Sequence, residues 1–152
     1  MTDTPPAPRV LAPGEGTTYD FLGHTFTDKV TVADGCQFCV QEIVQRPGGE
    51  PPLHIHHRED EAFYLLAGRM TFYLDGREVE VVPGSFVLAP RGVPHTFTVD
   101  SEEARLLQVL GPTGTEAAFR DLAGQPLDPA ALAAALAVYG VEIVGPPPRP
   151  RT

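Results

Sequence analysis

The stretch "PPLHIHHREDEAF", residues 51–63, decides the fold. It holds three of the chain's five histidines beside a run of acidic residues, and an apolar segment begins where it ends. It is either a charged surface loop or a binding site. On a β-strand, side chains two residues apart point to the same side. His54 and His56 therefore share one face, and Ile55 and His57 share the other.

Two further residues complete a set of metal ligands. Glu61 lies five residues after His56, across a short acidic turn, and begins an apolar strand. His95 begins a later strand after "PRGVP", residues 90–94. If these strands close into a barrel, three imidazoles and one carboxylate converge inside it, and nitrogen and oxygen ligands of this kind suit a transition metal. An isolated H-x-H pair is more often two surface residues, so the surrounding turns carry the prediction.

Those turns predict an all-β fold. Residues 69–74 and 77–82 form two strands joined by Asp75-Gly76, a strong hairpin signal. Short strands separated by turns every 8 to 12 residues indicate a sandwich or barrel. The remaining strands are expected within residues 17–44, where Gly23 and Gly35 interrupt them, and at 85–89, 95–99 and 104–110.

Near the C-terminus the pattern becomes helical. In "LDPAALAAALAVYG", residues 127–140, Asp128 can cap a helix and Gly140 can end it. Leu132 and Leu136 share one face, which should pack on the barrel. A shorter helix is expected within residues 115–124. The predicted divisions are a flexible N-terminal segment (1–16), a β-barrel (17–112), a helical segment packed on the barrel (113–145) and a Pro-rich tail (146–152).

Composition and charge exclude several classes of protein. The 152 residues are 42% hydrophobic, with a formal net charge of −9 and no basic stripe, so we expect no nucleic-acid partner. No window reaches the roughly 18 apolar residues that span a bilayer, and the first residues do not resemble a signal peptide, so we expect a cytoplasmic protein. Cys36 and Cys39 lie in one predicted strand with no second CxxC, which favours two small buried or edge thiols over a zinc or redox site.

Two spaced motifs resemble those of the cupin family. The first reads Gly48, "GEPPL", His54-Ile55-His56, "HRED", Glu61, "AFYLLA", Gly68. The second reads Gly84, "SFVLA", Pro90-Arg91-Gly92, "VP", His95, "TFT", Val99. The family has Asn where this chain has Val99, at a position with no metal role.

The resemblance implies a cupin jelly-roll β-barrel or sandwich with short C-terminal helices. It also implies that His54, His56, Glu61 and His95 bind one divalent transition metal, which could be Fe, Ni, Co, Mn, Cu or Zn. Four protein ligands leave two positions open, and open positions suit catalysis. Glu61 could then serve as both ligand and catalytic base.

Several other polar and apolar residues lie close to these four in the sequence. His57 is expected at the surface, and His24 in an exposed turn. Glu59 and Asp60 are expected in the turn before Glu61, although a strand register shifted by one residue would make Asp60 the ligand. Five residues could line a substrate pocket or simply form the core: Tyr64, Met70, Phe72, Leu88 and Phe97.

Within the family the chain is most similar to small bacterial quercetin-dioxygenase-like cupins, through "HHREDEAFYLLAG" and "APRGVPHTF". This resemblance implies a metal-dependent dioxygenase acting with O₂ on a small aromatic or enol substrate. Two alternatives remain open: a non-redox isomerase, cyclase or lyase of secondary metabolism, and a protein that binds a small molecule without chemistry. We expect a homodimer, because an exposed β edge offers a route to pairing, and no membrane partner.

Overall fold

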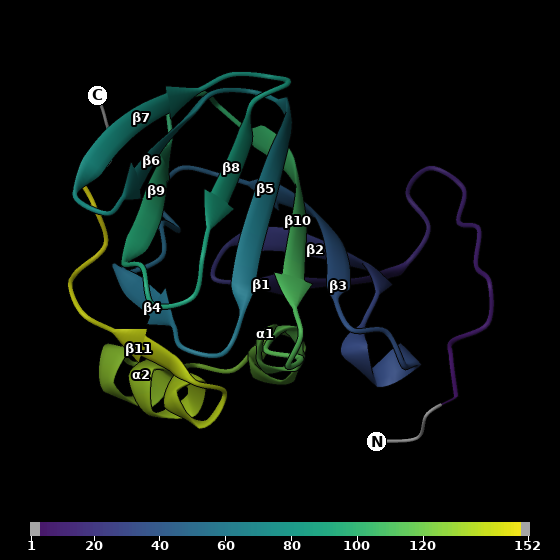
Figure 1. Ribbon diagram of the computed structural model, residues 1–152. Coiled ribbons are helices and arrows are strands. Elements are labelled where there is room, and N and C mark those ends of the chain that lie inside the picture. The colour runs from purple at the N-terminus through teal and green to yellow at the C-terminus, as the bar shows by residue number, and fades with distance from the viewer. Residues whose placement is uncertain (1–3, 150–152) are drawn as a thin grey trace.

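Two antiparallel β-sheets lie face to face and enclose the core (Figure 1). The computed structural model describes residues 4–149, so the outer ends of the two predicted terminal segments, 1–3 and 150–152, lie outside the described residues. The first sheet has the order β1 (Thr17–Phe21), β2 (His24–Val30), β3 (Cys39–Gln45), β10 (Ala104–Gly111), β5 (Asp60–Ala67) and β8 (Phe86–Ala89). The second sheet has the order β11 (Val141–Ile143), β4 (His54–His56), β9 (His95–Val99), β6 (Met70–Leu74) and β7 (Arg77–Val81).

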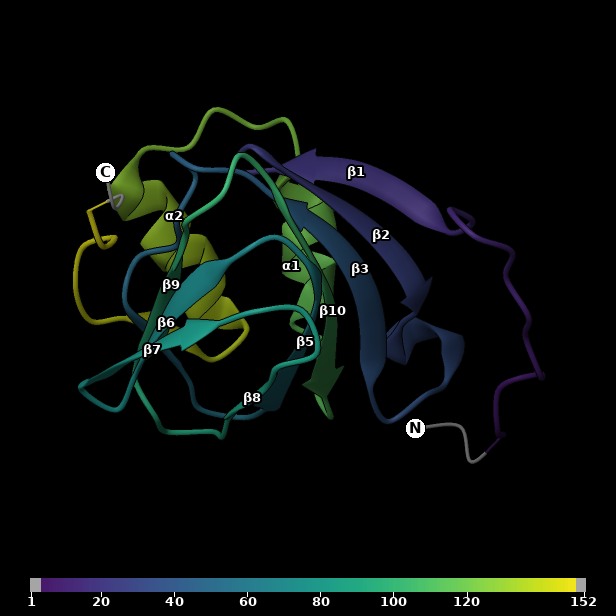
Figure 2. The same cartoon turned by 90° about the horizontal axis from the view of Figure 1, so that it is seen from above.

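Sequence neighbours are separated between the two sheets, as a jelly roll requires. Strand β4 lies in the five-stranded sheet, and β5, the next strand in the chain, lies in the six-stranded sheet. Seen from above, the two sheets curve around a common interior (Figure 2). The predicted all-β jelly roll is confirmed.

Alternation along the central strands decides which side chains face this interior. Strand β3 buries every second residue from Cys39 to Gln45, and β10 buries every second residue from Ala104 to Leu110. Most of these inward positions are apolar, but Gln41, Gln45 and Gln108 are buried among them. Three amides therefore lie inside a largely hydrophobic sandwich.

Turns require glycine at two informative places. Asp75 and Gly76 both have positive φ, 49° and 72°, which is the two-residue hairpin turn predicted between β6 and β7. Gly68, the last glycine of the first motif, has φ 85°, and a Cβ there would lie 2.4 Å from the backbone oxygen of Glu103. A side chain at Gly68 would be strained and would clash with the loop before β10.

The C-terminal segment closes one end of the sandwich. Helices α1 (Glu116–Leu122) and α2 (Pro129–Val138) lie below the sheets in Figure 1. The Asp128 carboxylate caps α2 by accepting a hydrogen bond from the backbone N–H of Ala131 at 2.8 Å. Leu132 and Leu136 are buried against the core, as predicted.

One element of this segment was not predicted. After α2 the chain returns as β11 and pairs with β4 along all three of its residues. The stretch assigned to helical structure therefore also adds a strand to the barrel. A three-residue strand between Gly140 and the prolines at 146–148 leaves no periodic signal in the sequence.

The N-terminal residues 4–16 contain no helix or strand, and side chains tie them to the sheet. Arg9 pairs with Asp34 at 3.0 Å, and Lys29 donates to the backbone oxygen of Glu15 at 2.7 Å. The flexibility of this segment stays a prediction. None of the helices within residues 4–149 is long and apolar enough to cross a membrane.

The two cysteines are free and differ in environment. Cys39 is fully buried at the start of β3, whereas the partly buried Cys36 lies in the loop before it. The prediction of one strand carrying both was wrong, because a 3-10 turn (Val32–Asp34) followed by Gly35 at φ 97° delays the strand until Cys39.

Candidate metal centre

The four predicted ligands come together between the sheets. One donor atom from each of His54, His56, Glu61 and His95 lies within 4.8 Å of the other three. The Oε2 of Glu61 is 2.8 Å from the Nε2 of His95 and 3.4 Å from the Nε2 of His56. Only 3%, 4% and 1% of His56, Glu61 and His95 are exposed. The cluster is therefore closed to bulk water on most sides.

The topology explains why residues so distant in sequence meet. His54 is paired directly with His95 across β4 and β9, and His56 is two residues further along the same face of β4. Glu61 enters from the opposite sheet on β5, where it is paired with Ala89 and Leu110. The cluster thus bridges the two sheets, three imidazoles from one and a carboxylate from the other.

Backbone carbonyls orient two of the imidazoles. The Nδ1 of His54 lies 2.8 Å from the backbone oxygen of Pro52, and the Nδ1 of His95 lies 3.0 Å from that of Val93. A carbonyl only accepts, so each Nδ1 carries a proton and the Nε2 of each ring is the atom available to a metal. Metal-binding histidines in proteins are commonly held in this way. The donor set therefore fits a divalent transition metal.

A residue outside the predicted set supports the third imidazole. Glu59 is 1% exposed, and its Oε2 lies 3.6 Å from the Nδ1 of His56. The other oxygen of Glu59 accepts three hydrogen bonds: from the N–H and hydroxyl of Thr113 at 3.1 and 2.7 Å, and from the N–H of Thr115 at 3.0 Å. Within residues 4–149, neither Glu59 Oε2 nor His56 Nδ1 has a hydrogen-bond partner, so the two atoms interact only through their charges.

Glu59 precedes β5 as expected, but its side chain is not part of a solvated turn. It points inward because the loop at 113–115, over fifty residues later, supplies its donors. The sequence carries no signal that joins these two segments.

The electrostatics of the cluster favour a cation. Burial, aided by the neighbouring His95, lowers the pKa of His54 to about 3. Burial opposes ionisation of Glu61, but the adjacent His56 and His95 outweigh it and lower the pKa of this carboxyl to about 2. Burial would also lower the pKa of His56, but the carboxylates of Glu61 and Glu59 outweigh it and the pKa is raised. Two ionised carboxylates therefore meet one readily protonated imidazole.

The remaining candidates near the cluster lie outside it. His57 is exposed, as predicted, and pairs with Glu142 at 2.6 Å. Asp60 faces outward and binds Arg91 at 2.8 Å. The shifted register that would have made Asp60 a ligand is therefore wrong.

His24 was predicted to be exposed and is instead 4% exposed. Its Nε2 lies 2.6 Å from the backbone oxygen of Gly49, and its Nδ1 accepts a hydrogen bond from the N–H of Arg46 at 3.1 Å. The "LGHT" turn is shorter than expected, because β2 begins at His24 itself. The ring is therefore directed inward, under the loop that contains Gly48 and Gly49, here called the glycine loop.

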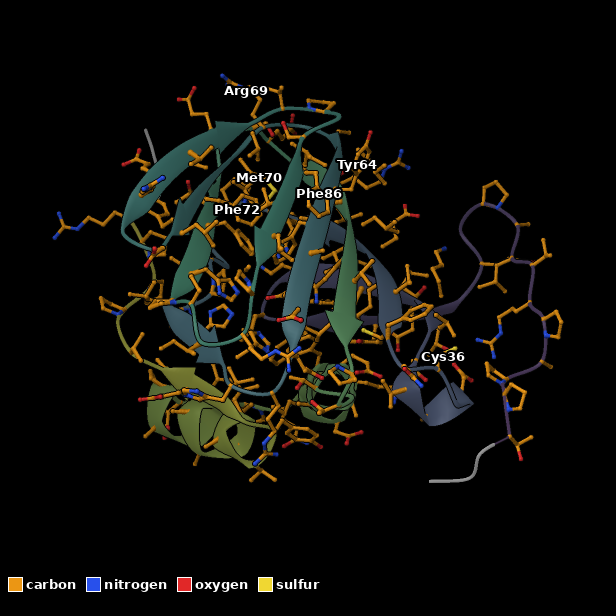
Figure 3. The ribbon with its side chains drawn as sticks, in the orientation of Figure 1. Cys36, Tyr64, Arg69, Met70, Phe72 and Phe86 are labelled. Atoms are coloured by element: carbon orange, nitrogen blue, oxygen red, sulfur yellow. The ribbon has the colours of Figure 1, made fainter. Side chains whose placement is uncertain are left out.

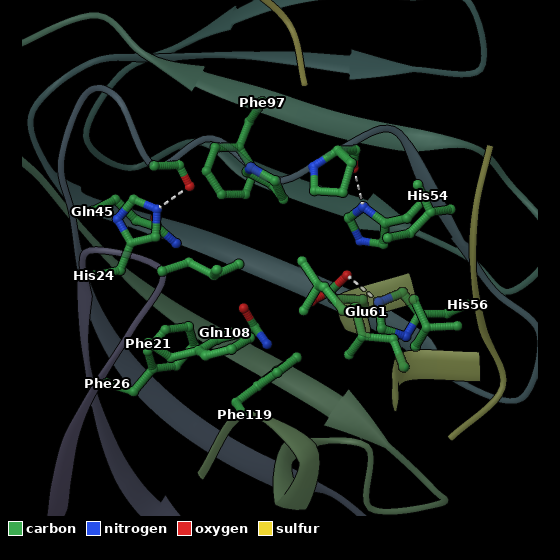
Figure 4. A pocket seen from close by; sticks show the side chains of 18 of the residues that line it. Phe21, His24, Phe26, Gln45, His54, His56, Glu61, Phe97, Gln108 and Phe119 are labelled. Carbon is green, nitrogen blue, oxygen red and sulfur yellow. Dashed lines mark hydrogen bonds and ion pairs between the residues drawn. The ribbon is translucent and has the colours of Figure 1, made fainter. Parts of the chain in front are cut away.

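An apolar cavity of about 90 Å³ adjoins the cluster (Figure 4). His54, His56 and Glu61 form part of its wall, and Pro51 and Pro52 lie beside them. The rest of the wall is largely aromatic, with rings from β1, β2, β5, β9 and α1: Phe21, Phe26, Phe63, Phe97 and Phe119.

Only one of the five predicted pocket residues, Phe97, lines this cavity. Met70 and Phe72 are buried in the core away from it, whereas Tyr64 and Leu88 are 45% and 48% exposed. Figure 3 shows Tyr64 over the six-stranded sheet and Met70 and Phe72 between the sheets. Alternation on β5 turns Tyr64 outward, because Glu61 and Phe63 face inward. The rings from β1, β2 and α1 were missed because no sequence pattern relates them to the motifs.

Comparison with known proteins agrees with the fold. The cupin domain family matches residues 41–110. Residues 41–110 therefore form a cupin domain.

Particular relatives narrow the comparison. The chain is 36% identical over 124 residues to quercetin 2,3-dioxygenase of Bacillus subtilis. The aligned region covers 80% of this chain but only 36% of that enzyme. The polyketide cyclase RemF from Streptomyces resistomycificus shares 25% identity at a TM-score of 0.59, covering 70% of this chain and 80% of RemF. KdgF from Halomonas sp. superposes at a TM-score of 0.62 over 70% of this chain and 94% of its own, with 17% identity, and shows the fold alone.

Proposed function

We propose that this chain is a metal-dependent dioxygenase that acts with O₂ on a small aromatic or enol substrate. The observation that carries the proposal is the position of the four-donor cluster on the wall of an aromatic-lined cavity. The identity to a quercetin 2,3-dioxygenase supports the choice of reaction, although the chain spans about a third of that enzyme.

In this proposal His54, His56, Glu61 and His95 hold one divalent metal. When bound, the metal would polarise a coordinated substrate oxygen and, if redox-active, exchange electrons with O₂. Four protein ligands leave coordination positions for substrate.

The protein contributes binding, orientation and a base. The phenylalanine rings bind a flat substrate and exclude water from it. Glu61 is ionised and its Oε2 lies 2.8 Å from the Nε2 of His95. It can accept a proton from a substrate hydroxyl held beside it, and is the residue we assign as base.

A non-redox cyclase is the second candidate, because the structural match to the polyketide cyclase RemF extends over 80% of that protein. The same four residues and the same cavity would then serve to polarise a substrate carbonyl, without O₂. Binding of a small molecule without chemistry is the third outcome of the test below.

The test combines metal identification with activity screens in air and under argon. Protein purified without added metal is analysed by mass spectrometry, reconstituted with each of Fe, Mn, Co, Ni, Cu and Zn, and offered a panel of catechols and flavonols. Oxygen uptake with ¹⁸O₂ incorporation into product supports the proposal. Turnover under argon supports the cyclase, and binding without turnover supports a protein that binds a small molecule without chemistry. His95→Ala should abolish any turnover, whereas the exposed His57→Ala should retain it.

A further inference from the structure

The cavity has a second polar end, opposite the metal-binding cluster. Figure 4 shows Gln45 and His24 together at one end and His54, His56 and Glu61 at the other, with aromatic rings between. Gln45 is 3% exposed and lines the cavity. Its Oε1 has no hydrogen-bond partner within residues 4–149. A buried amide oxygen without a partner is costly, so it marks a position where a ligand could supply the missing bond.

The neighbouring imidazole cannot supply that bond. Both nitrogens of His24 are already used, one by the carbonyl of Gly49 and the other by the N–H of Arg46. His24 therefore holds the glycine loop in place. The packing there is close, since a Cβ on Gly49 would lie 2.3 Å from the backbone oxygen of Leu22.

A chain of hydrogen bonds orients a second amide on the same wall. Asp28 accepts from Arg120 at 3.0 Å and from the Nε2 of Gln41 at 2.7 Å. The Oε1 of Gln41 then accepts from the Nε2 of Gln108 at 3.3 Å. An ionised carboxylate only accepts, so each amide is fixed in turn, and Gln108 keeps its Oε1 for the cavity that it lines. The wall therefore offers carbonyl oxygens to a donor.

The strand register shows how far apart the two ends are. Leu110 is paired with both Cys39 and Glu61, so these three residues form one row across the sheet. Gln45 lies six residues along β3 from that row, which corresponds to about 20 Å at 3.3 Å per residue. Side chains reach inward from both ends, yet a single aromatic ring is too short to contact both. An occupant that does so is an elongated molecule of two or three rings, which is larger than the cavity of about 90 Å³ and must displace part of its wall on entry.

We propose that Gln45 is a specificity-determining residue that binds a hydroxyl group at the far end of a flat, multi-ring phenolic substrate. A hydroxyl donates and accepts, and therefore pairs with the amide in either orientation. The assignment of the near end rests on the proposed function; the assignment of Gln45 rests on its own burial and missing partner.

The test uses two flavonols, kaempferol and galangin, which differ by one hydroxyl on the ring remote from their chelating oxygens. Calorimetric titration under argon measures binding separately from turnover. The protein should bind kaempferol about 10-fold more tightly than galangin, as one hydrogen bond to a buried group predicts. In Gln45→Met, which keeps the length but not the amide, the preference should fall to within about 2-fold.

Three controls separate recognition from structural damage. Gln45→Leu repeats the substitution with another shape, and its melting temperature reports folding. Phe97→Leu alters the apolar wall and should weaken both flavonols alike. Catechol, a single ring, should bind wild type and Gln45→Met equally.

Each result of the titrations either overturns or upholds the role proposed for Gln45. Equal affinity of wild type for the two flavonols, no binding of either, or a preference that survives both Gln45 variants overturns the proposal. A preference that depends on Gln45 upholds it, even if no oxygen-dependent turnover occurs, in which case the dioxygenase proposal fails and the recognition site stands.

Discussion

The two sides of the stretch "HIHHREDE", residues 54–61, carry the same residue types in opposite environments. On the inner side, His56, Glu59 and Glu61 are at most 4% exposed. On the outer side, His57 pairs with Glu142 and Asp60 pairs with Arg91. All four of these side chains are exposed to solvent. Residue type alone therefore does not make a ligand here. The position of each side chain relative to the strand and its turn decides whether it is buried, where charges interact strongly, or exposed, where solvent screens them.

The largest effect should follow from removing an inner imidazole. His95→Ala should lower metal affinity by at least about 100-fold, more than the roughly 10–100-fold cost of losing a group that only supports a ligand. Competition with a chromogenic chelator measures the affinity. His57→Ala is the matched outer control and should bind metal as the wild type does. Equal loss in both variants would contradict the division into two sides.

Glu59 tests whether the inner side extends beyond the ligands. Glu59→Gln leaves Thr113 and Thr115 with an acceptor but removes the charge facing His56, so metal affinity should fall by about 10–100-fold. The same chelator competition reports it. Unchanged affinity would make Glu59 a purely structural link to the loop at 113–115.

The pH dependence of stability should also separate Glu59 from the outer acids. Burial opposes its ionisation, but the facing His56 imidazole and the hydrogen bonds from Thr115 and Thr113 prevail and lower the pKa of Glu59 to about 2. A carboxyl with a lowered pKa stabilises the folded state above its ordinary pKa, and this contribution is lost as the pH falls toward the folded value. Glu59→Gln should therefore melt below wild type at pH 7, and the gap should narrow by pH 3. A gap that widens on acidification would refute the charge-based account.

Acid should also release the metal. His56, whose pKa is raised by Glu61 and Glu59 against the effect of burial, binds metal only without its proton. As the pH falls through that pKa, protons compete and affinity declines. Metal retention measured from pH 8 to pH 5 should fall in this direction. Retention that is independent of pH over this range would show that His56 is not a ligand.

The smallest effect should come from the outer pair. Asp60→Asn removes an exposed ion pair with Arg91, and such pairs contribute little, so the melting temperature should change by less than about 2 °C. Metal affinity should stay the same. A marked loss of metal would mean that Asp60 takes part in the site after all.

The fold and the four-residue cluster could be predicted because both depend on local spacing. Alternation placed His54 and His56 on one face, and turn glycines such as Gly68 fixed where the strands end. The cavity could not be predicted in the same way. Its rings include Phe21 and Phe119, which reach the site only through packing between the first hairpin and α1.

The burial of Glu59 and His24 could not be predicted for a related reason. Turn positions, where both residues are expected, are usually at the surface. Their burial depends on partners far away in the sequence, Thr113 for Glu59 and Gly49 for His24. Spacing within a motif reports the strand a residue belongs to, but not the loop that later covers it.

The short strand β11 has a consequence for how the protein is made. Strand β4, which carries two of the candidate ligands, shares a single residue pair with β9, and its other edge is held by β11 through Val141 and Ile143. A ribosome produces β4 almost ninety residues before its second neighbour. During synthesis the strand that carries these two imidazoles therefore lacks one of its two neighbours until Ile143 has emerged.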